Sequence, residues 1–473
     1  MKTFYITTTL PYVNADPHIG FAFELVSADI IARYKKLQGY EVFFNTGTDE
    51  HGTKVLQKAT EEGKDPQVYT DEYAEKFKQL KEPLGLLPDI HFIRTTDKQH
   101  VQAVQEFWKR CSASGDIYKK NYRVQYCVGC ELEKTDSELE NGRCPIHPNL
   151  TLQTIEEENY FFRLSKYQEK LLALFERTGF MVPAFRLNEV RSLIKEKGLE
   201  DFSISRLASK MPWGVLVPGD SEHVMYVWFD ALVNYISTIG WPSDMVTFEK
   251  WWPVVQFAGK DQVRQQAVMW QAMLMSAGIA PSKQIVIHGF ITNGGQKMSK
   301  SLGNVVDPLT LVKEYGTDAL RWYLARHLHP FEDSDFTLEK FKEGYNADLA
   351  NGIGNLTSRI MKMAADNLSA PVTLPESSIL KEFPECFERY EIQQSAMLIA
   401  SKVTSLDVRI QETQPFKLVK QDKEKGIALI QELVGGLSGI ARMLEPILPM
   451  TSKKIQMLVE TNRMPTEPLF PRK

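Results

Sequence analysis

Two short pairs of potential metal ligands lie close together in the sequence. They are Cys127-x2-Cys130 and Cys144-x2-His147, and thirteen residues separate them. Thiolates and imidazoles paired on tight turns, which Gly129 favours, can close a tetrahedron around zinc. Four protein ligands leave no open coordination position, so the pattern predicts one structural zinc ion. Four unmetallated residues or a disulfide are the alternatives, and a reducing compartment disfavours the disulfide.

Two other segments carry groups suited to a polyphosphate. His18 and Gly20 stand at the start of a predicted helix, where unpaired N–H groups and the positive dipole end favour phosphate. An imidazole there can add a donor, and glycine lets a nucleotide ring approach the backbone. Lys297 and Lys300 lie three residues apart in a glycine-rich loop and can both point at one triphosphate. Taken singly, the two segments are more simply explained as a helix cap and a solvated basic loop.

The composition is that of an ordinary globular protein. Of 473 residues, 43% are hydrophobic, 25% charged and 11% aromatic, which excludes a disordered chain. The formal net charge of −4 gives no global sign of a nucleic-acid partner, although a local basic face can still bind one. Five cysteines favour a reducing compartment over a disulfide framework. Because we find neither a membrane-length apolar run nor a signal-peptide pattern, we expect a cytoplasmic protein that does not enter a membrane.

These segments need helices and strands to position them. Residues 4–7 predict a strand, a helix capped at Asp16 follows, and residues 42–44 predict a second strand. Such a unit makes a right-handed crossover in a parallel sheet, whose ligands bind beyond the carboxyl ends of the strands. Residues 9–12 and 46–52 fall at those ends. The sequence therefore predicts an α/β fold with its site at this edge.

The rest of the chain predicts an insertion and a helical end. Helical periodicity fades between residues 112 and 223, and the α/β pattern resumes between 254 and 288. Beyond Pro308 the chain is nearly all helix, with an apolar stripe that slips at Gly435 and Gly436. That stripe is typical of a helical bundle.

Five segments, in order along the chain, resemble motifs of the class I aminoacyl-tRNA synthetases and, more narrowly, of the methionyl-tRNA synthetase family. The likeness runs from residue 3 to about residue 460. The five segments are residues 11–20, 46–52, 226–231, 259–261 and 297–301. The resemblance implies an α/β fold with a class I Rossmann-type parallel sheet, split by a zinc-bearing connective insertion and followed by an all-α anticodon-binding bundle.

The same resemblance implies the domain boundaries. The expected parts are a first Rossmann catalytic half at 1–111, the connective insertion with its zinc knuckle at 112–223, the second catalytic half with the lysine loop at 224–308, a linking helical segment at 309–345 and the anticodon-binding domain at 346–473.

The resemblance also implies which residues hold the substrates. The expected methionine site comprises Leu10, through its backbone, with Tyr12, Asp49, Trp228, Ala231, Tyr235 and Gln266. The expected site for ATP and its magnesium comprises His18, Gly20, Asp261, His288, Lys297, Ser299 and Lys300, of which His18, Lys297 and Lys300 are the catalytic residues. The residue types fit, because a carboxylate suits the substrate ammonium and aromatic rings suit a thioether.

Three positions depart from the family pattern. Phe21 stands where the first motif usually ends in a second histidine, and Gln266 stands where another histidine is common. Losing one transition-state hydrogen bond can cost about 3–4 kcal/mol, so we expect slower activation. In the helical end, Asn355 and Arg359 fit the family's anticodon-reading run, but Phe416 replaces the tryptophan that stacks on the first anticodon base.

The activity that the resemblance implies is that of a methionine–tRNA ligase. Methionine and ATP give methionyl-adenylate and pyrophosphate, and tRNA(Met) then takes the methionyl group with release of AMP. We expect a monomer. A synthetase-like paralogue that binds tRNA or nucleotide with weak or no catalysis is the alternative, which Phe21 and Gln266 suggest. The valine, isoleucine and leucine families carry a large editing domain for which the insertion has no room, and the cysteine family holds its zinc in the amino-acid site.

Overall fold

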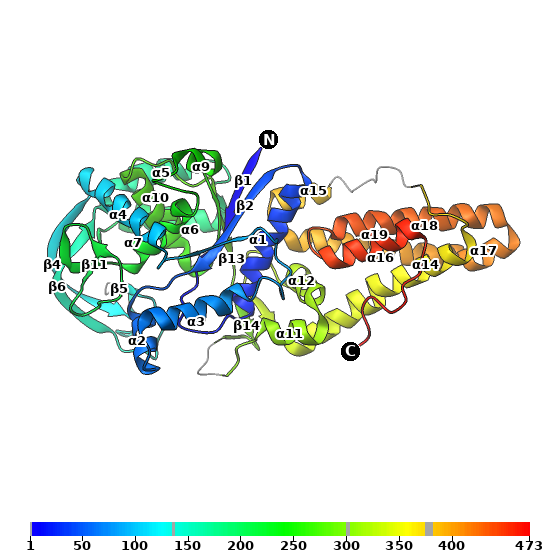
Figure 1. Ribbon diagram of the computed structural model, residues 1–473, viewed down its shortest axis with the longest axis horizontal. Helices are drawn as coiled ribbons and strands as arrows, with labels where there is room; N and C mark the ends of the chain where they lie inside the picture. Colours follow the sequence, from blue (N-terminus) through cyan, green and yellow to red (C-terminus); the bar gives the residue numbers. More distant parts are fainter. Residues whose placement is uncertain (1, 135–137, 299–302, 374–381) are drawn as a thin grey trace. The chain divides into compact units, whose positions relative to one another are not determined.

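The computed structural model (Figure 1) describes residues 2–134, 138–298, 303–373 and 382–473. The chain divides into two compact units, which we describe separately. Unit 1 comprises Met1–Pro17, Glu41–Gln79 and Asp89–Ile287, and unit 2 comprises His18–Tyr40, Leu80–Pro88 and His288–Lys473. The predicted domain boundaries subdivide the chain differently, and they stay predictions.

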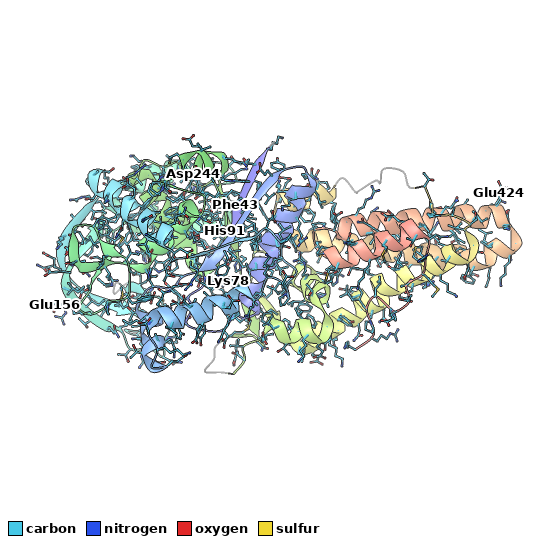
Figure 2. The ribbon with its side chains drawn as sticks, in the orientation of Figure 1. Phe43, Lys78, His91, Glu156, Asp244 and Glu424 are labelled. Carbon is cyan, nitrogen blue, oxygen red and sulfur yellow. The ribbon has the colours of Figure 1, made fainter. Side chains whose placement is uncertain are left out.

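A six-stranded sheet in the order β3-β2-β1-β12-β13-β7 forms the centre of unit 1. Its strands are β1 (Thr3–Thr7), β2 (Glu41–Thr48), β3 (His91–Arg94), β7 (Met181–Val182), β12 (Val255–Gly259) and β13 (Gln284–His288). β1 pairs in parallel with both β2 and β12, which confirms the predicted sheet. The strand order reverses between β1 and β12, and ligands of such sheets bind beyond the carboxyl ends at this point. Near one edge, the Phe43 ring lies 5.6 Å from the His91 ring (Figure 2).

Two antiparallel sheets fill the region of the predicted insertion. One has the order β5-β4-β6-β8 and consists of β4 (Ile117–Cys127), β5 (Leu132–Lys134), β6 (Gln153–Phe162) and β8 (Phe202–Ser203). The other has the order β10-β11-β9 and consists of β9 (Ser205–Leu207), β10 (Leu216–Val217) and β11 (Asp220–Met225). Because Cys127 pairs with Leu132, the turn between β4 and β5 carries Cys130. The hairpin therefore presents two of the predicted metal ligands at its tip.

Helices complete unit 1 around a core rich in aromatic side chains. The helices are α2 (Thr53–Glu61), α3 (Pro66–Lys78), α4 (Lys98–Ala113), α5 (Gln168–Phe175), α6 (Ala184–Lys197), α7 (Val227–Ala231), α8 (Asn234–Ser237), α9 (Met245–Trp251) and α10 (Trp270–Ser276). In the core, Phe107 of α4 stacks on Trp270 of α10 at 5.6 Å and meets Phe229 of α7 edge-on. Burial of such rings is a large hydrophobic contribution to stability.

Unit 2 is mainly helical, as predicted, but it contains a small sheet. Its helices are α1 (Ile19–Leu37), α11 (Pro308–Tyr315), α12 (Thr317–Arg326), α13 (Leu338–Gly344), α14 (Asn355–Asn367), α15 (Glu382–Glu388), α16 (Ile392–Thr413), α17 (Pro415–Gln421), α18 (Lys423–Leu444) and α19 (Pro449–Thr461). The sheet has the order β15-β14-β16, from β14 (Ile291–Asn293), β15 (Gln296–Lys297) and β16 (Ser334–Phe336). Buried Arg321 connects three segments of unit 2, since it pairs with Asp29 at 2.8 Å and donates to the Ile447 carbonyl at 2.7 Å.

Among the described residues, one helix, α18, is long and apolar enough to cross a membrane, judged by length and composition alone. Most of the apolar stretch of this helix is buried inside unit 2, as in the core helix of a bundle. The helix continues unbroken through Gly435 and Gly436, where the apolar stripe is predicted to slip. A side chain at Gly436 would lie 2.8 Å from Leu406 Cδ2, so this glycine permits close packing of α16 on α18.

One sequence-based expectation is wrong in detail. The cap of α1 is His18 and not Asp16, whose carboxylate binds Lys76 Nζ at 2.8 Å instead. The segment that leads into α10 is π-helical over Arg264–Met269, and the Gln271 side chain donates to the Gln266 carbonyl at 2.9 Å. A polar side chain that satisfies the backbone in this way lets the helix widen locally.

Candidate active site and metal centre

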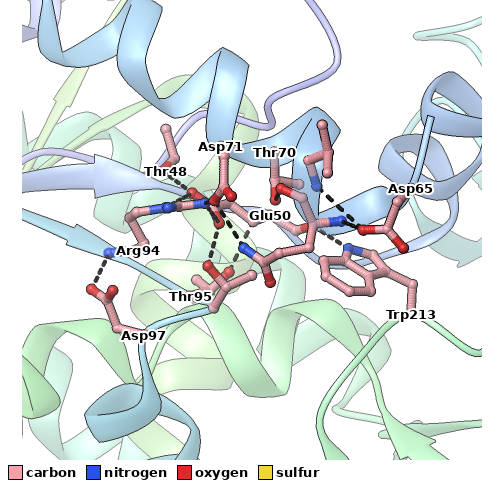
Figure 3. Close-up of polar contacts among 12 residues, drawn as sticks. Thr48, Glu50, Asp65, Thr70, Asp71, Arg94, Thr95, Asp97 and Trp213 are labelled. Atoms are coloured by element: carbon pink, nitrogen blue, oxygen red, sulfur yellow. Dashed lines mark hydrogen bonds and ion pairs between the residues drawn. The ribbon is translucent and has the colours of Figure 1, made fainter. Parts of the chain in front are cut away.

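A buried carboxylate fixes the segment that follows β2 (Figure 3). Glu50 is 0% exposed and binds Arg94 through two contacts of 2.7 and 2.8 Å. The Thr48 hydroxyl donates to Glu50 at 2.6 Å, and Arg94 also pairs with Asp71 at 2.6 Å. Such a paired arrangement holds the neighbouring Asp49 in one orientation.

Arg94→Met should lower the free energy of unfolding by about 3–5 kcal/mol, because it leaves the Glu50 carboxylate buried without its partner. Thermal and denaturant unfolding measure the change. Arg123→Met is the matched control, since the Arg123 side chain is 71% exposed in its ion pair with Glu156, and it should change stability by less than about 0.5 kcal/mol. Equal stability of the two variants would contradict the role assigned to Glu50 and Arg94.

Asp49 lies directly opposite Tyr12 in a short parallel bridge. The Asp49 amide donates to the Pro11 carbonyl at 2.9 Å, and the Val13 amide donates to the Asp49 carbonyl at 3.3 Å. Asp49 is 2% exposed, and its Oδ1 has no hydrogen-bond partner within the described residues. Burial, with the nearby carboxylate of Asp230, raises the pKa of Asp49 well above its usual value. A cationic ligand group would relieve that unfavourable burial.

Aromatic rings stand beside this carboxylate. The Tyr12 ring meets the Trp228 ring edge-on at 6.1 Å, and Lys54 Nζ lies 4.7 Å from the Tyr12 ring centre. Trp228 Nε1 is buried, and nothing in the described part of the chain hydrogen-bonds to it. The structure therefore brings together three of the residues predicted for the methionine site.

The other predicted methionine-site residues lie in the same unit. Gln266 donates to the Tyr235 hydroxyl at 2.8 Å and accepts from Gln256 at 2.7 Å, so both ends of its amide are used. Ala231 is buried at the end of α7, and Leu10 is half-buried after β1. A neutral amide network thus occupies the position where the family commonly has a histidine.

A buried group that sequence analysis missed lies beneath α7. The carboxylate of Asp230 contacts His51 Nδ1 at 2.6 Å and His100 Nε2 at 2.9 Å, and His100 Nδ1 contacts the Ser237 hydroxyl at 2.9 Å. Burial alone would raise the pKa of Asp230, but the two histidines lower this pKa to about 2. His51 and Asp230 stand in motifs singled out from the sequence, but nothing in their spacing indicates that they meet.

In unit 2, His18 and Gly20 form the start of α1 as predicted from their types. His18 Nδ1 accepts from the Gly20 amide at 3.0 Å, so the neutral ring carries its hydrogen on Nε2. A side chain at Gly20 would lie 2.9 Å from His18 Cε1, so a residue without a side chain fits best at this position. The Ile19 amide donates to the Val306 carbonyl at 2.9 Å. This bond fastens the start of the helix to the segment that follows the predicted lysine loop.

The base of that loop is a short hairpin of β14 and β15. Asp335 accepts from the Gly295 amide at 2.7 Å and from the Thr292 hydroxyl at 2.9 Å. Lys297 belongs to β15, but its side chain lies outside the described residues, as do Ser299 and Lys300. Their predicted contacts with ATP stay predictions.

The remaining predicted ATP-site residues are His288 in unit 2 and Asp261 in unit 1. His288 Nε2 contacts the Glu24 carboxylate at 2.7 Å, and its Nδ1 contacts the Gly289 carbonyl at 2.8 Å. These two contacts, one at each ring nitrogen, fix the orientation of the ring. Asp261 is exposed in a short turn after β12.

The four predicted metal ligands come together in unit 1. The ligand atoms of Cys127, Cys130, Cys144 and His147 all lie within 4.8 Å of one another. Cys130 Sγ is 3.5 Å from Cys144 Sγ and 3.2 Å from His147 Nδ1. Tetrahedral zinc with bonds of about 2.3 Å places its sulfur ligands roughly 3.8 Å apart, so the cluster fits such an ion. Gly129 permits the fit, since a side chain there would lie 2.5 Å from His147 Cγ.

The predicted anticodon residues lie on two helices of unit 2. Asn355 is exposed at the start of α14, and Arg359, one turn later, pairs with Asp407. Phe416 of α17 is 50% exposed, which is unusual for a ring of its size. Asn355 and Phe416 are thus exposed, whereas Arg359 is half-buried in its ion pair.

Comparisons with known proteins agree on one family. The family model described as "tRNA synthetases class I (M)" matches residues 4–149 and 130–361. The chain is 42% identical to a "Methionine--tRNA ligase" of Thermotoga maritima over 98% of this chain and 76% of the relative, and 41% identical to one of Synechocystis over 96% and 89%. The structure of Mycobacterium tuberculosis methionyl-tRNA synthetase in complex with methionyl-adenylate superposes with a TM-score of 0.92, at 35% identity and with full coverage of both chains.

Proposed function

The chain belongs to the methionyl-tRNA synthetase family of class I synthetases, and on that basis we propose that it acts as a methionine–tRNA ligase. It activates methionine with ATP, giving methionyl-adenylate and pyrophosphate, and transfers the methionyl group to tRNA(Met) with release of AMP. The observation that carries this proposal is the buried Asp49 carboxylate beside Tyr12 and Trp228. It offers a site for an ammonium group next to rings that suit a thioether.

The chemistry needs positioning and charge stabilisation more than proton transfer. The substrate carboxylate is itself the nucleophile that attacks the α-phosphate, so no general base is required. His18 can donate from Nε2 to a phosphate oxygen at the start of α1, and Lys297 and Lys300 add positive charge with the magnesium that accompanies ATP. Gly20, Asp261, Ser299 and His288 complete the proposed ATP site.

We propose that Cys127, Cys130, Cys144 and His147 hold one structural zinc ion. Purified protein should then contain close to one zinc per chain by inductively coupled plasma mass spectrometry. Cys130→Ser should lose most of this zinc, because serine is a poor ligand for it. Cys386→Ser is the control, since this buried cysteine belongs to unit 2 and not to the cluster. Unchanged zinc in Cys130→Ser would contradict the ligand set.

Asn355, Arg359 and Phe416 are proposed to read the anticodon. Stacking of a base on an aromatic ring is worth about 1–3 kcal/mol, so Phe416→Ala should reduce tRNA charging by roughly 5- to 150-fold. Methionine-dependent ATP–pyrophosphate exchange, which needs no tRNA, should be unchanged. Met397→Ala is the control, because Met397 is another exposed apolar side chain of unit 2. An equal loss in charging and exchange would refute the assignment.

The deciding test of the proposed function is ATP–pyrophosphate exchange with methionine, and with leucine, cysteine and homocysteine for comparison. We expect exchange with methionine alone, by a monomer that works in the cytoplasm. Folded, zinc-loaded protein without exchange would contradict the proposal and favour a paralogue that only binds tRNA or nucleotide.

A further inference from the structure

Glu131 occupies an unusual place at the tip of the β4–β5 hairpin. It follows the metal ligand candidate Cys130 directly, and its φ of 49° puts it in the left-handed region. Residues other than glycine, asparagine and aspartate rarely adopt that conformation. Glu131 is also 0% exposed, which is rare for a glutamate. Specific contacts must therefore hold it there.

Those contacts reach two different segments. The Glu131 Oε1 atom accepts a hydrogen bond from the Lys54 amide at 3.0 Å, in the first turn of α2. The Glu131 backbone carbonyl accepts a hydrogen bond from the Tyr226 hydroxyl. A side chain at Gly52 would lie 3.2 and 3.3 Å from the two Glu131 carboxylate oxygens. The turn before α2 is thus shaped to receive this carboxylate.

The two segments carry Asp49 and Trp228 of the candidate amino-acid site, and we call them the two walls of that site. Asp49 directly follows β2, and Lys54 lies in the first turn of the next helix, α2, with its Nζ 4.7 Å from the Tyr12 ring centre. Tyr226 is the N-cap residue of α7, which carries Trp228. Glu131 therefore touches the wall that bears Asp49 with its side chain and the wall that bears Trp228 with its backbone.

We propose that Glu131 is a positioning residue that links the metal cluster of Cys127, Cys130, Cys144 and His147 to the candidate amino-acid site. This inference rests on the proposed function. A metal ion fixes Cys130, and the next residue in the chain then holds the walls of Asp49 and Trp228 at the spacing that methionine needs. Loss of the metal or of the Glu131 side chain loosens the same link, so it weakens methionine binding more than it slows the chemistry on ATP.

Equilibrium binding of methionine without ATP tests the link, with zinc content and thermal unfolding measured for each variant. Glu131→Ala should raise the Kd for methionine about tenfold. Glu131→Gln should bind within about threefold of wild type, because the glutamine oxygen can still accept from Lys54. Glu140→Ala, at an exposed acid between β5 and β6, should bind as wild type does. In exchange assays Glu131→Ala should raise the KM for methionine and change kcat less than twofold.

Removal of zinc with a chelator tests the connection to the metal. Metal-free wild type should bind methionine about tenfold more weakly, and added zinc should restore the affinity. Removing zinc from Glu131→Ala should weaken its methionine binding little further, since two changes to one link are not additive. Tyr226→Phe removes the other contact of Glu131 and should also weaken binding, which keeps the test valid if Glu131→Ala folds poorly.

Two outcomes would overturn the link while the proposed function stands. One is wild-type affinity in Glu131→Ala and Tyr226→Phe. The other is an equal loss on zinc removal in wild type and Glu131→Ala. A wild-type protein that binds no methionine would overturn the proposed function as well.

Discussion

Asp49→Asn is expected to reduce kcat/KM for methionine activation by roughly 10²–10³-fold, because it removes the buried charge that pairs with the substrate ammonium. Asparagine has nearly the same shape, so the loss reports charge and not packing. For stability we predict the opposite effect. Burial and the neighbouring Asp230 disfavour ionised Asp49 and raise its pKa well above the usual value. The neutral variant should therefore unfold at a higher temperature than the wild type in the absence of methionine.

The pH dependence of methionine binding follows from the same shift. Because methionine needs the ionised carboxylate, its KM should fall as the pH rises through the raised pKa of Asp49. Methionine affinity should thus rise with pH, whereas the stability of the protein without methionine should fall, because the folded state binds the Asp49 proton more tightly than the unfolded chain and loses that advantage as the pH rises. In Asp49→Asn both trends should weaken. Glu196→Gln, at an exposed acid of α6, serves as the control. Unchanged activation by Asp49→Asn would remove Asp49 from the methionine site.

Local patterns were the part of the site that the sequence could predict. The spacing of Cys127, Cys130, Cys144 and His147 predicts a cluster because each pair lies on one turn, and the structure brings the four ligand atoms together. The strand at β1 and the parallel sheet follow likewise from short apolar runs before turn residues. These features depend on neighbours in the chain.

Contacts between distant segments could not be predicted in the same way. The pair of His51 and Asp230 joins residues 179 positions apart, and His100 adds a third segment with no motif of its own. Glu131 stood beside a recognised ligand, but its role depends on where Lys54 and Tyr226 fall in three dimensions. Local rules favour Asp16 as the cap of α1, but in the structure His18 is the cap and Asp16 binds Lys76, 60 positions along the chain.

His18→Ala should lower kcat for adenylate formation by roughly 10²–10³-fold, the usual cost of losing one donor to a charged transition state. The same change removes the cap of α1 and should lower stability by about 0.5–2 kcal/mol. The two effects need separating, because a frayed helix start could also slow the reaction. Exchange kinetics with saturating methionine, together with thermal unfolding, measure both.

His18→Asn separates the cap from the donor. Asparagine is a good capping residue, and its side-chain oxygen can accept from the Gly20 amide as His18 Nδ1 does. Stability should therefore return to the wild-type value. The rate should stay low, because the shorter amide does not place a donor where imidazole Nε2 lies. Wild-type kcat in His18→Asn would mean that the histidine serves only as a cap, and the stabilisation of the phosphate would then have to come from the helix start and the lysine loop alone.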